Sequence, residues 1–254
     1  MKKNILFITT LILLLTSCKS YLINNYFKSV GVYDDNIKLE KLTADDNEIV
    51  LFVMHHIGKN VFYEDVKLKI DSLKKLDYLF YIEGIKSNFG GKNKLSKQDS
   101  IVIIDMAYKF RKISGKPLIS KDLETDHIKI LKDNGIKVNF ELVKQPSYDE
   151  LGLSSEFYKN TDLKIEELLE MYENKYGKII LESCDYSTKY YENSICKNKL
   201  DKKRFTPFLV DERNNSILRH ITNENKNRIA IIYGKEHFIG VKDSLQKLGY
   251  KITR

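Results

Sequence analysis

The 254-residue sequence lacks the motifs by which several common classes of protein are recognised. It has no Gly-rich phosphate loop, no zinc-finger spacing and no RNA-stacking motif, so we do not expect a nucleic-acid partner. It also has no Gly-x-Ser-x-Gly elbow, the usual mark of a serine hydrolase. The formal charge of +8 arises from lysines spread along the chain, which is typical of a solvated surface.

Cysteine and histidine are scarce, with three and five residues respectively. No two cysteines have the close Cys-x-x-Cys spacing of a zinc site. Cys184 and Cys196 are twelve positions apart, and the sequence leaves two alternatives for them, a disulfide that closes this loop or two buried free thiols.

The first 18 residues have the order of a secretory signal. Two lysines precede an apolar stretch from Ile5 to Leu15, which is too short for a permanent membrane span. The stretch ends in Leu-Thr-Ser-Cys, which resembles the lipobox of bacterial lipoproteins, in which the cysteine is acylated and becomes the first residue. We therefore expect Cys18 to carry a lipid anchor that holds the protein on a membrane of the bacterial cell envelope, outside the cytoplasm.

This interpretation divides the chain into three parts. Residues 1–17 are expected to be the lipoprotein signal peptide, residues 18–35 the lipidated cysteine with a tether, and residues 36–254 one folded domain. The tether is expected to be a short linker, because residues 19–35 show no clear hydrophobic period.

Apolar runs of strand length alternate with segments of helical spacing in the expected domain. The runs at 48–54, 77–84 and 227–234 are continuous, as in strands that are covered on both faces. The helical segments are 61–76, 100–113, 127–135, 162–177 with Thr161 or Asp162 as cap, 205–221 as a loop into a helix, and 236–249. This alternation predicts an α/β fold with a mostly parallel central sheet flanked by helices, its two halves meeting at a cleft at the carboxyl ends of the strands.

Three residues with useful chemistry follow these apolar runs: His56, Glu83 and His237. The carboxyl ends of parallel strands meet at one edge of a sheet, so we expect these side chains to share a site. Two imidazoles and a carboxylate are a common ligand set for a divalent metal with open positions. The alternative for each is a hydrogen-bonded structural histidine or a solvated charge at the end of a strand.

Three stretches resemble the TraB/PrgY/GumN family, which is related to the TIKI proteases and more distantly to ChaN-like and erythromycin-esterase-like proteins. They are HHIGKNVFYEDVKLKIDSLKKLDYLFYIEG at 55–84, DERNNSILRHI at 211–221 and IAIIYGKEHFIGVKDSLQKLGYKI at 229–252. The resemblance spans about residues 48–254 and is strongest at the two ends. It implies a metal-dependent hydrolase that acts on peptides.

The resemblance also implies roles for individual residues. His56, Glu83 and His237 would hold the metal, and Glu83, Arg213 and His237 would be catalytic, with Arg213 orienting a carboxylate or stabilising negative charge. The sequence departs from the family at Val53, where the family has a glycine, and this substitution could block the approach of a ligand.

Two further expectations accompany this interpretation. His55 stands beside His56, and alternate residues of a strand face opposite sides, so only one of the two can reach the site, and we expect it to be His56. The alternative function is a lipoprotein without catalytic activity that captures a peptide, haem or another small molecule in the same cleft.

Overall fold

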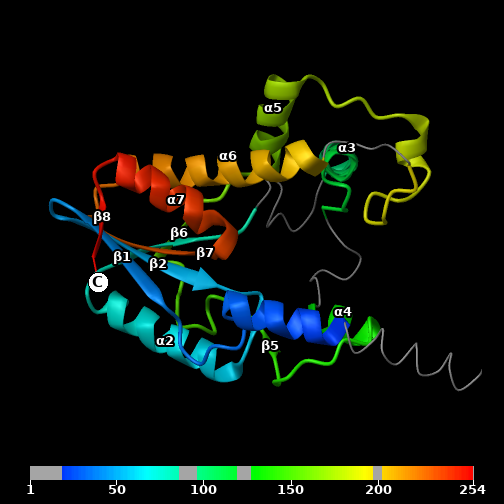
Figure 1. Ribbon diagram of the computed structural model, residues 1–254. Coiled ribbons are helices and arrows are strands. Elements are labelled where there is room, and N and C mark those ends of the chain that lie inside the picture. The colour runs from blue at the N-terminus through cyan, green and yellow to red at the C-terminus, as the bar shows by residue number, and fades with distance from the viewer. Residues whose placement is uncertain (1–18, 86–95, 119–126, 197–201, 254) are drawn as a thin grey trace, which may run out of the picture.

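A computed structural model describes residues 19–85, 96–118, 127–196 and 202–253 of the chain. The predicted signal peptide and Cys18 lie outside these residues. Within them the fold is α/β, a six-stranded, mixed but mostly parallel sheet flanked by helices, as predicted (Figure 1). No helix in the described ranges is long and apolar enough to cross a membrane.

The sheet has the strand order β6-β4-β7-β2-β1-β8. Its strands are β1 (Leu39–Ala44), β2 (Asn47–Met54), β4 (Leu79–Ile82), β6 (Tyr158–Asn160), β7 (Arg228–Gly234) and β8 (Lys251–Thr253). The four strands β6, β4, β7 and β2 run parallel, and β1 is antiparallel to both of its neighbours. Strand β7, late in the sequence, lies between β2 and β4, so it brings the C-terminal part of the chain to the centre of the sheet.

Helices bury both faces of the sheet. They are α2 (Asn60–Lys74) on one face and α6 (Lys202–Thr222) and α7 (Lys235–Lys247) on the other (Figure 1). Alternate residues of β2 pack on opposite sides: Val50 and Phe52 join the α2 core, and Ile49 and Leu51 join the α6 and α7 core. The central strands therefore read as unbroken apolar runs because neither face is solvated.

A separate hydrophobic cluster lies beyond the carboxyl ends of the strands (Figure 1). It joins α3 (Lys97–Ser114), α5 (Ile165–Tyr176) and the first half of α6, with Leu168, Phe205 and Phe208 at its centre. A short 3-10 helix, η1 (Ser183–Tyr186), follows α5 and begins a loop that packs on α3.

The loop after α5 is closed by a disulfide between Cys184 and Cys196, one of the two alternatives that the sequence left open. The guanidinium group of Arg111, which is 1% exposed, donates to carbonyl groups of this loop, at 2.6 Å to Lys189 and 2.9 Å to Glu192. Among the described residues this buried cation has no carboxylate partner, so backbone oxygens stabilise it and the loop is fixed to α3.

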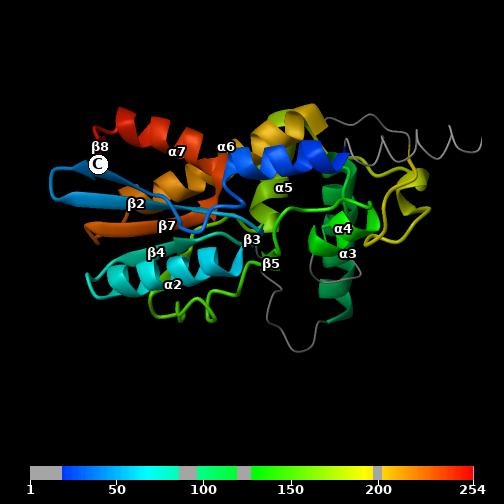
Figure 2. The same ribbon diagram turned by 60° about the horizontal axis from the view of Figure 1, so that its bottom comes forward.

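The predicted linker is wrong for residues 19–30, which form a helix (Figure 2). Phe27 of this helix packs in a cluster with Leu142, near α4 (His127–Asp133) and the small sheet of β3 (Ile57–Gly58) and β5 (Val143–Lys144). The prediction failed because half of this helix faces solvent with tyrosine and leucine side chains, which hides its hydrophobic period.

Two helix boundaries also differ from the prediction. Helix α5 begins after Lys164, so neither Thr161 nor Asp162 caps it. Helix α6 continues through Pro207, although proline has no N–H to bond the carbonyl group one turn earlier and its ring crowds that group. Arg213 therefore lies in the middle of a 21-residue helix and not near its start.

Candidate functional site

A cavity of about 580 Å³ opens at the carboxyl ends of β2, β4 and β7. Its wall is formed by the strand ends, by the β5 segment, by α4 and by α6. The polar lining residues are His56, Glu83, His127, Lys144, Gln145, Tyr148, Arg213 and Tyr233. We call this space the strand-end cavity. Its size is within the range of sites that bind small molecules or short segments of a peptide.

The two adjacent histidines line different cavities. His56 is exposed and lines the strand-end cavity, where its ring stacks on that of His127 with 5.3 Å between centroids. His55 lines a second cavity of about 230 Å³, next to the helix of residues 19–30. Val53 lines that second cavity as well, so it does not stand between a ligand and His56. The two histidines thus face different cavities, with His56 at the predicted site, although both lie in the short connection between β2 and β3 and not within a strand.

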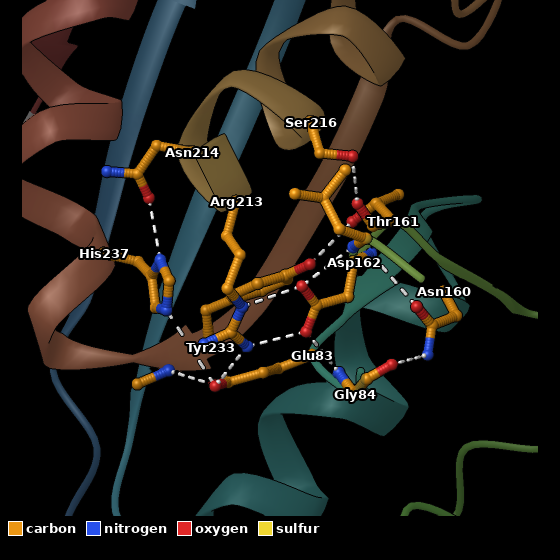
Figure 3. A network of polar contacts seen from close by, with 12 residues as sticks. Glu83, Gly84, Asn160, Thr161, Asp162, Arg213, Asn214, Ser216, Tyr233 and His237 are labelled. Carbon is orange, nitrogen blue, oxygen red and sulfur yellow. Dashed lines mark hydrogen bonds and ion pairs between the residues drawn. The ribbon is translucent and has the colours of Figure 1, made fainter. Parts of the chain in front are cut away.

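Glu83 directly follows β4, and both of its carboxylate oxygens accept hydrogen bonds (Figure 3). Oε1 accepts from Arg213 Nη2 at 2.7 Å, and Oε2 accepts from the backbone N–H of Gly234 at 2.8 Å. The side chain is 22% exposed, so it stands at the boundary between the protein interior and the cavity. The end of β7 and the middle of α6 together set its orientation.

Arg213 is held from the other side by Asp162, whose side chain is fully buried. Asp162 accepts from Arg213 Nε at 2.8 Å and Nη2 at 2.6 Å, and its Oδ2 also accepts from the N–H of Gly84 at 2.9 Å. Burial by itself would lower the pKa of Arg213, but the hydrogen bonds and negative charges of Asp162 and Glu83 raise it above its ordinary value. Arg213 is thus permanently charged. Its third nitrogen, Nη1, has no hydrogen bond to any residue in the described part of the chain.

His237 lies in the first turn of α7 and is 3% exposed. Its Nδ1 is 2.7 Å from Asn214 Oδ1, an oxygen that only accepts, so Nδ1 carries the proton. Burial and the nearby charge of Arg213 lower the pKa of His237, which keeps the ring neutral near pH 7. Nε2 therefore presents a lone pair, 3.9 Å from Glu83 Oε1 (Figure 3).

The contact that orients His237 depends on close packing between α6 and α7. A Cβ atom at Gly240 would lie 2.6 Å from Asn214 Nδ2, closer than atoms can approach. Glycine at this position lets the two helices approach until Asn214 reaches the imidazole. The ring of Tyr233 packs edge-on against His237, with 5.3 Å between centroids, and limits its rotation from the other side.

The metal site of His56, Glu83 and His237 stays a prediction, and the arrangement of these side chains does not favour it. No group of three His, Cys, Asp or Glu residues within the described ranges is placed to share an ion. Glu83 already accepts bonds with both oxygens, and the charge of Arg213 beside it opposes a second cation. His56 reaches the cavity but is not part of the cluster formed by Glu83, Asp162, Arg213 and His237, which we call the Glu83 cluster.

The structure thus brings together three of the predicted site residues, Glu83, Arg213 and His237, and places His56 on the wall of the same cavity. Sequence reasoning missed Asp162, because an aspartate before a helix was interpreted as a cap. It also missed Asn214, although this residue directly follows Arg213 in the stretch that carries the resemblance.

The comparisons with known proteins add no family: no family model, no curated protein and no solved structure matches this chain. The resemblance to the TraB/PrgY/GumN family therefore stays a prediction.

Proposed function

We propose that this chain is a lipid-anchored envelope hydrolase that cleaves peptides in the strand-end cavity. The observation that carries the proposal is the pair of basic atoms His237 Nε2 and Glu83 Oε1, 3.9 Å apart, of which Glu83 lines the cavity and His237 is buried behind it. The lipid anchor at Cys18 and the likeness to peptidases come from the sequence alone.

The spacing of this pair suits the activation of water. A water oxygen can lie about 2.8 Å from two acceptors that are 3.9 Å apart, with one of its O–H groups directed to each. As the water attacks a carbonyl carbon, its proton passes to His237 Nε2, and Glu83 stabilises the resulting imidazolium. His237 then returns the proton to the leaving amine when the C–N bond breaks.

Arg213 supplies positive charge for the same step. Asp162 and Glu83 hold it rigidly, so it needs no rearrangement to stabilise the negative oxygen of a tetrahedral intermediate. A substrate with a carboxylate near the cleaved bond suits this cavity, because Lys144 and the exposed ring of His56 also line it.

A metal-dependent version of this reaction is the family-based prediction, but the observed donor set does not favour it. We therefore assign no step to a metal.

The alternative function is capture of a peptide or small molecule without catalysis. One observation favours it: both oxygens of Glu83 are already hydrogen-bonded, as in a structural ion-pair network.

Incubation of the purified protein with a peptide library, read by mass spectrometry, tests the proposal. We expect cleavage that falls about 10²–10⁴-fold in kcat/KM for His237→Ala and for Glu83→Gln. The matched control is Glu236→Gln, which changes the neighbouring residue and should leave cleavage within twofold. Thermal melting of each variant separates loss of catalysis from loss of the fold.

Two further results would decide between the alternatives. Cleavage that persists in chelator supports the reaction without a metal, and loss of cleavage that added metal restores supports the family-based version. Retention of peptides without any cleavage, in wild type and Glu83→Gln alike, would overturn catalysis and support the binding function.

A further inference from the structure

The helix of residues 19–30 exposes apolar side chains on its outer face. Tyr21 is 69% exposed, Leu22 65% and Tyr26 56%. Leu22 and Tyr26 are four positions apart, so they form one stripe along the helix, and Tyr21 lies next to Leu22. An apolar stripe of this kind, on the side of the helix that faces away from the protein, suggests a surface that a membrane or another protein covers.

This stripe cannot turn inward, because the opposite face of the helix is docked. Asn24 is 8% exposed; its Nδ2 donates to the carbonyl of Lys137 at 2.7 Å, and its Oδ1 accepts from the N–H of Asn139 at 2.7 Å. Phe27, 9% exposed, packs into the adjoining hydrophobic cluster. These contacts fix which side of the helix faces outward.

The position of the stripe in the chain identifies what covers it. Tyr21 is three residues after Cys18, so the two Cα atoms are at most about 11 Å apart in any conformation. If acyl chains on Cys18 enter a bilayer, the first turns of the helix are therefore held at its surface. Tyrosine prefers this interface, where its ring contacts acyl chains and its hydroxyl group remains hydrated, and the exposed Lys19 and Lys28 suit anionic headgroups.

We propose that the helix of residues 19–30 lies flat on the lipid bilayer, with Tyr21, Leu22 and Tyr26 inserted at the interface. This inference rests on the proposed lipid anchor. It changes the expected attachment from a loose tether to a second membrane contact, which supplements the limited binding energy of a lipid anchor.

Membrane contact also orients the strand-end cavity. The docked face of the helix packs in one cluster with Ile57 and Leu142. Ile57 directly follows His56, and Leu142 lies two residues before Lys144; both His56 and Lys144 line the cavity. The wall of the cavity is therefore built on the segments that carry the membrane-facing helix, so the bilayer sets the orientation of the cavity.

Single-tryptophan variants test this inference, because the natural chain contains no tryptophan. Leu22→Trp and Tyr26→Trp report on the stripe. Leu68→Trp on α2 and Ile239→Trp on α7 are matched controls, since the natural side chains are 65% and 70% exposed. The protein is purified from bacterial membranes and placed in phosphatidylethanolamine and phosphatidylglycerol vesicles with brominated acyl chains, which quench tryptophan only on contact with the bilayer.

We expect at least twofold quenching by brominated lipid at the two stripe positions and none at the two controls. Equal exposure of all four positions to aqueous acrylamide would overturn the inference. Protection of the stripe from both quenchers would overturn it as well, because it would indicate that protein covers the helix.

Mass spectrometry of the same preparation separates this inference from the proposed anchor. Acylated Cys18 with unquenched stripe positions means that the anchor exists and the helix does not lie on the bilayer. If Cys18 is not acylated, the anchor fails, and protein added directly to the vesicles tests the helix: quenching at the stripe supports membrane contact, and its absence overturns it.

Discussion

Replacement of Asp162 by asparagine should remove a large part of the stability of the fold. The carboxylate is fully buried and neutralises Arg213, which is 9% exposed, through contacts of 2.6 and 2.8 Å. Asparagine has the same shape but carries no charge, and its amide has only one oxygen to accept hydrogen bonds. Each oxygen of Asp162 accepts from two donors, so two donors that now face a carboxylate oxygen would then face an NH₂ group.

The size of the effect follows from burial. The attraction between unit charges about 4 Å apart is about 4 kcal/mol at an effective dielectric constant near 20. Glu83 keeps part of the charge of Arg213 compensated, so the loss should not exceed the cost of breaking a buried ion pair, about 3–5 kcal/mol. That cost is a large fraction of the 5–15 kcal/mol typical of a folded domain and corresponds to a drop in Tm of roughly 6–20 °C.

Urea unfolding followed by circular dichroism measures this loss. The control is Asp77→Asn, which makes the same chemical change in an exposed pair with Lys226, where the two side chains are 84% and 49% exposed. Asparagine also tolerates the positive φ of 59° at this position. We expect the control to change the free energy of unfolding by less than about 1 kcal/mol. A loss that is equally small for Asp162→Asn would refute the argument that this ion pair organises the site.

Three other predictions concern the site and the disulfide. Gly240→Ala should displace Asn214 and reduce peptide cleavage at least tenfold while most of the stability remains; cleavage at the wild-type rate would mean that this contact does not orient the imidazole. The pKa of His237 is lower in the folded chain than its ordinary value of 6.5, so between these two pKa values the unfolded chain binds a proton that the folded chain does not. The contribution of this group to stability is therefore complete above pH 6.5 and is lost as the pH falls toward the lowered pKa. Urea unfolding at about pH 7.5 and 5.5 should show this decrease, and His237→Gln should reduce it. Reduction of the disulfide between Cys184 and Cys196 should cost about 3 kcal/mol at most in the chain-entropy model, and a melting temperature that does not change with reductant would contradict it.

The sequence predicted that Glu83 and His237 share a site at the strand ends, but not that Asp162 belongs to this site or that His56 lies apart from the cluster. His56, Glu83 and His237 each follow an apolar run, and topology alone brings such positions to one edge of a sheet. The distances between these side chains depend on contacts with other side chains, which the hydrophobic period of the sequence does not predict. Asp162 neutralises Arg213 only because the loop after β6 passes under α6, and this contact joins residues 51 positions apart. Both oxygens of Glu83 accept hydrogen bonds, from Arg213 and from the N–H of Gly234, so the structure shows an ion pair at the residue that the sequence predicts as a metal ligand.

The N-terminal region shows the same limit. Residues 19–30 show no clear hydrophobic period, which suggests a tether, but they form a helix that docks on the domain through Asn24, which bonds to Lys137 and Asn139. Local composition carries no information about partners more than 100 residues away.

The sequence by itself determined the α/β class and the central strands, because unbroken apolar runs occur only where both faces of a sheet are covered. It also predicted that only His56 of the two adjacent histidines reaches the site, although both lie in the connection between β2 and β3, so the pleat of a strand is not the reason. The tertiary structure alone decided that the site is a hydrogen-bonded cluster around Arg213, that His237 is neutral with its lone pair toward Glu83, and that the first helix faces outward with apolar side chains. Each of these depends on burial and on contacts between distant segments, which are set only when the chain is packed.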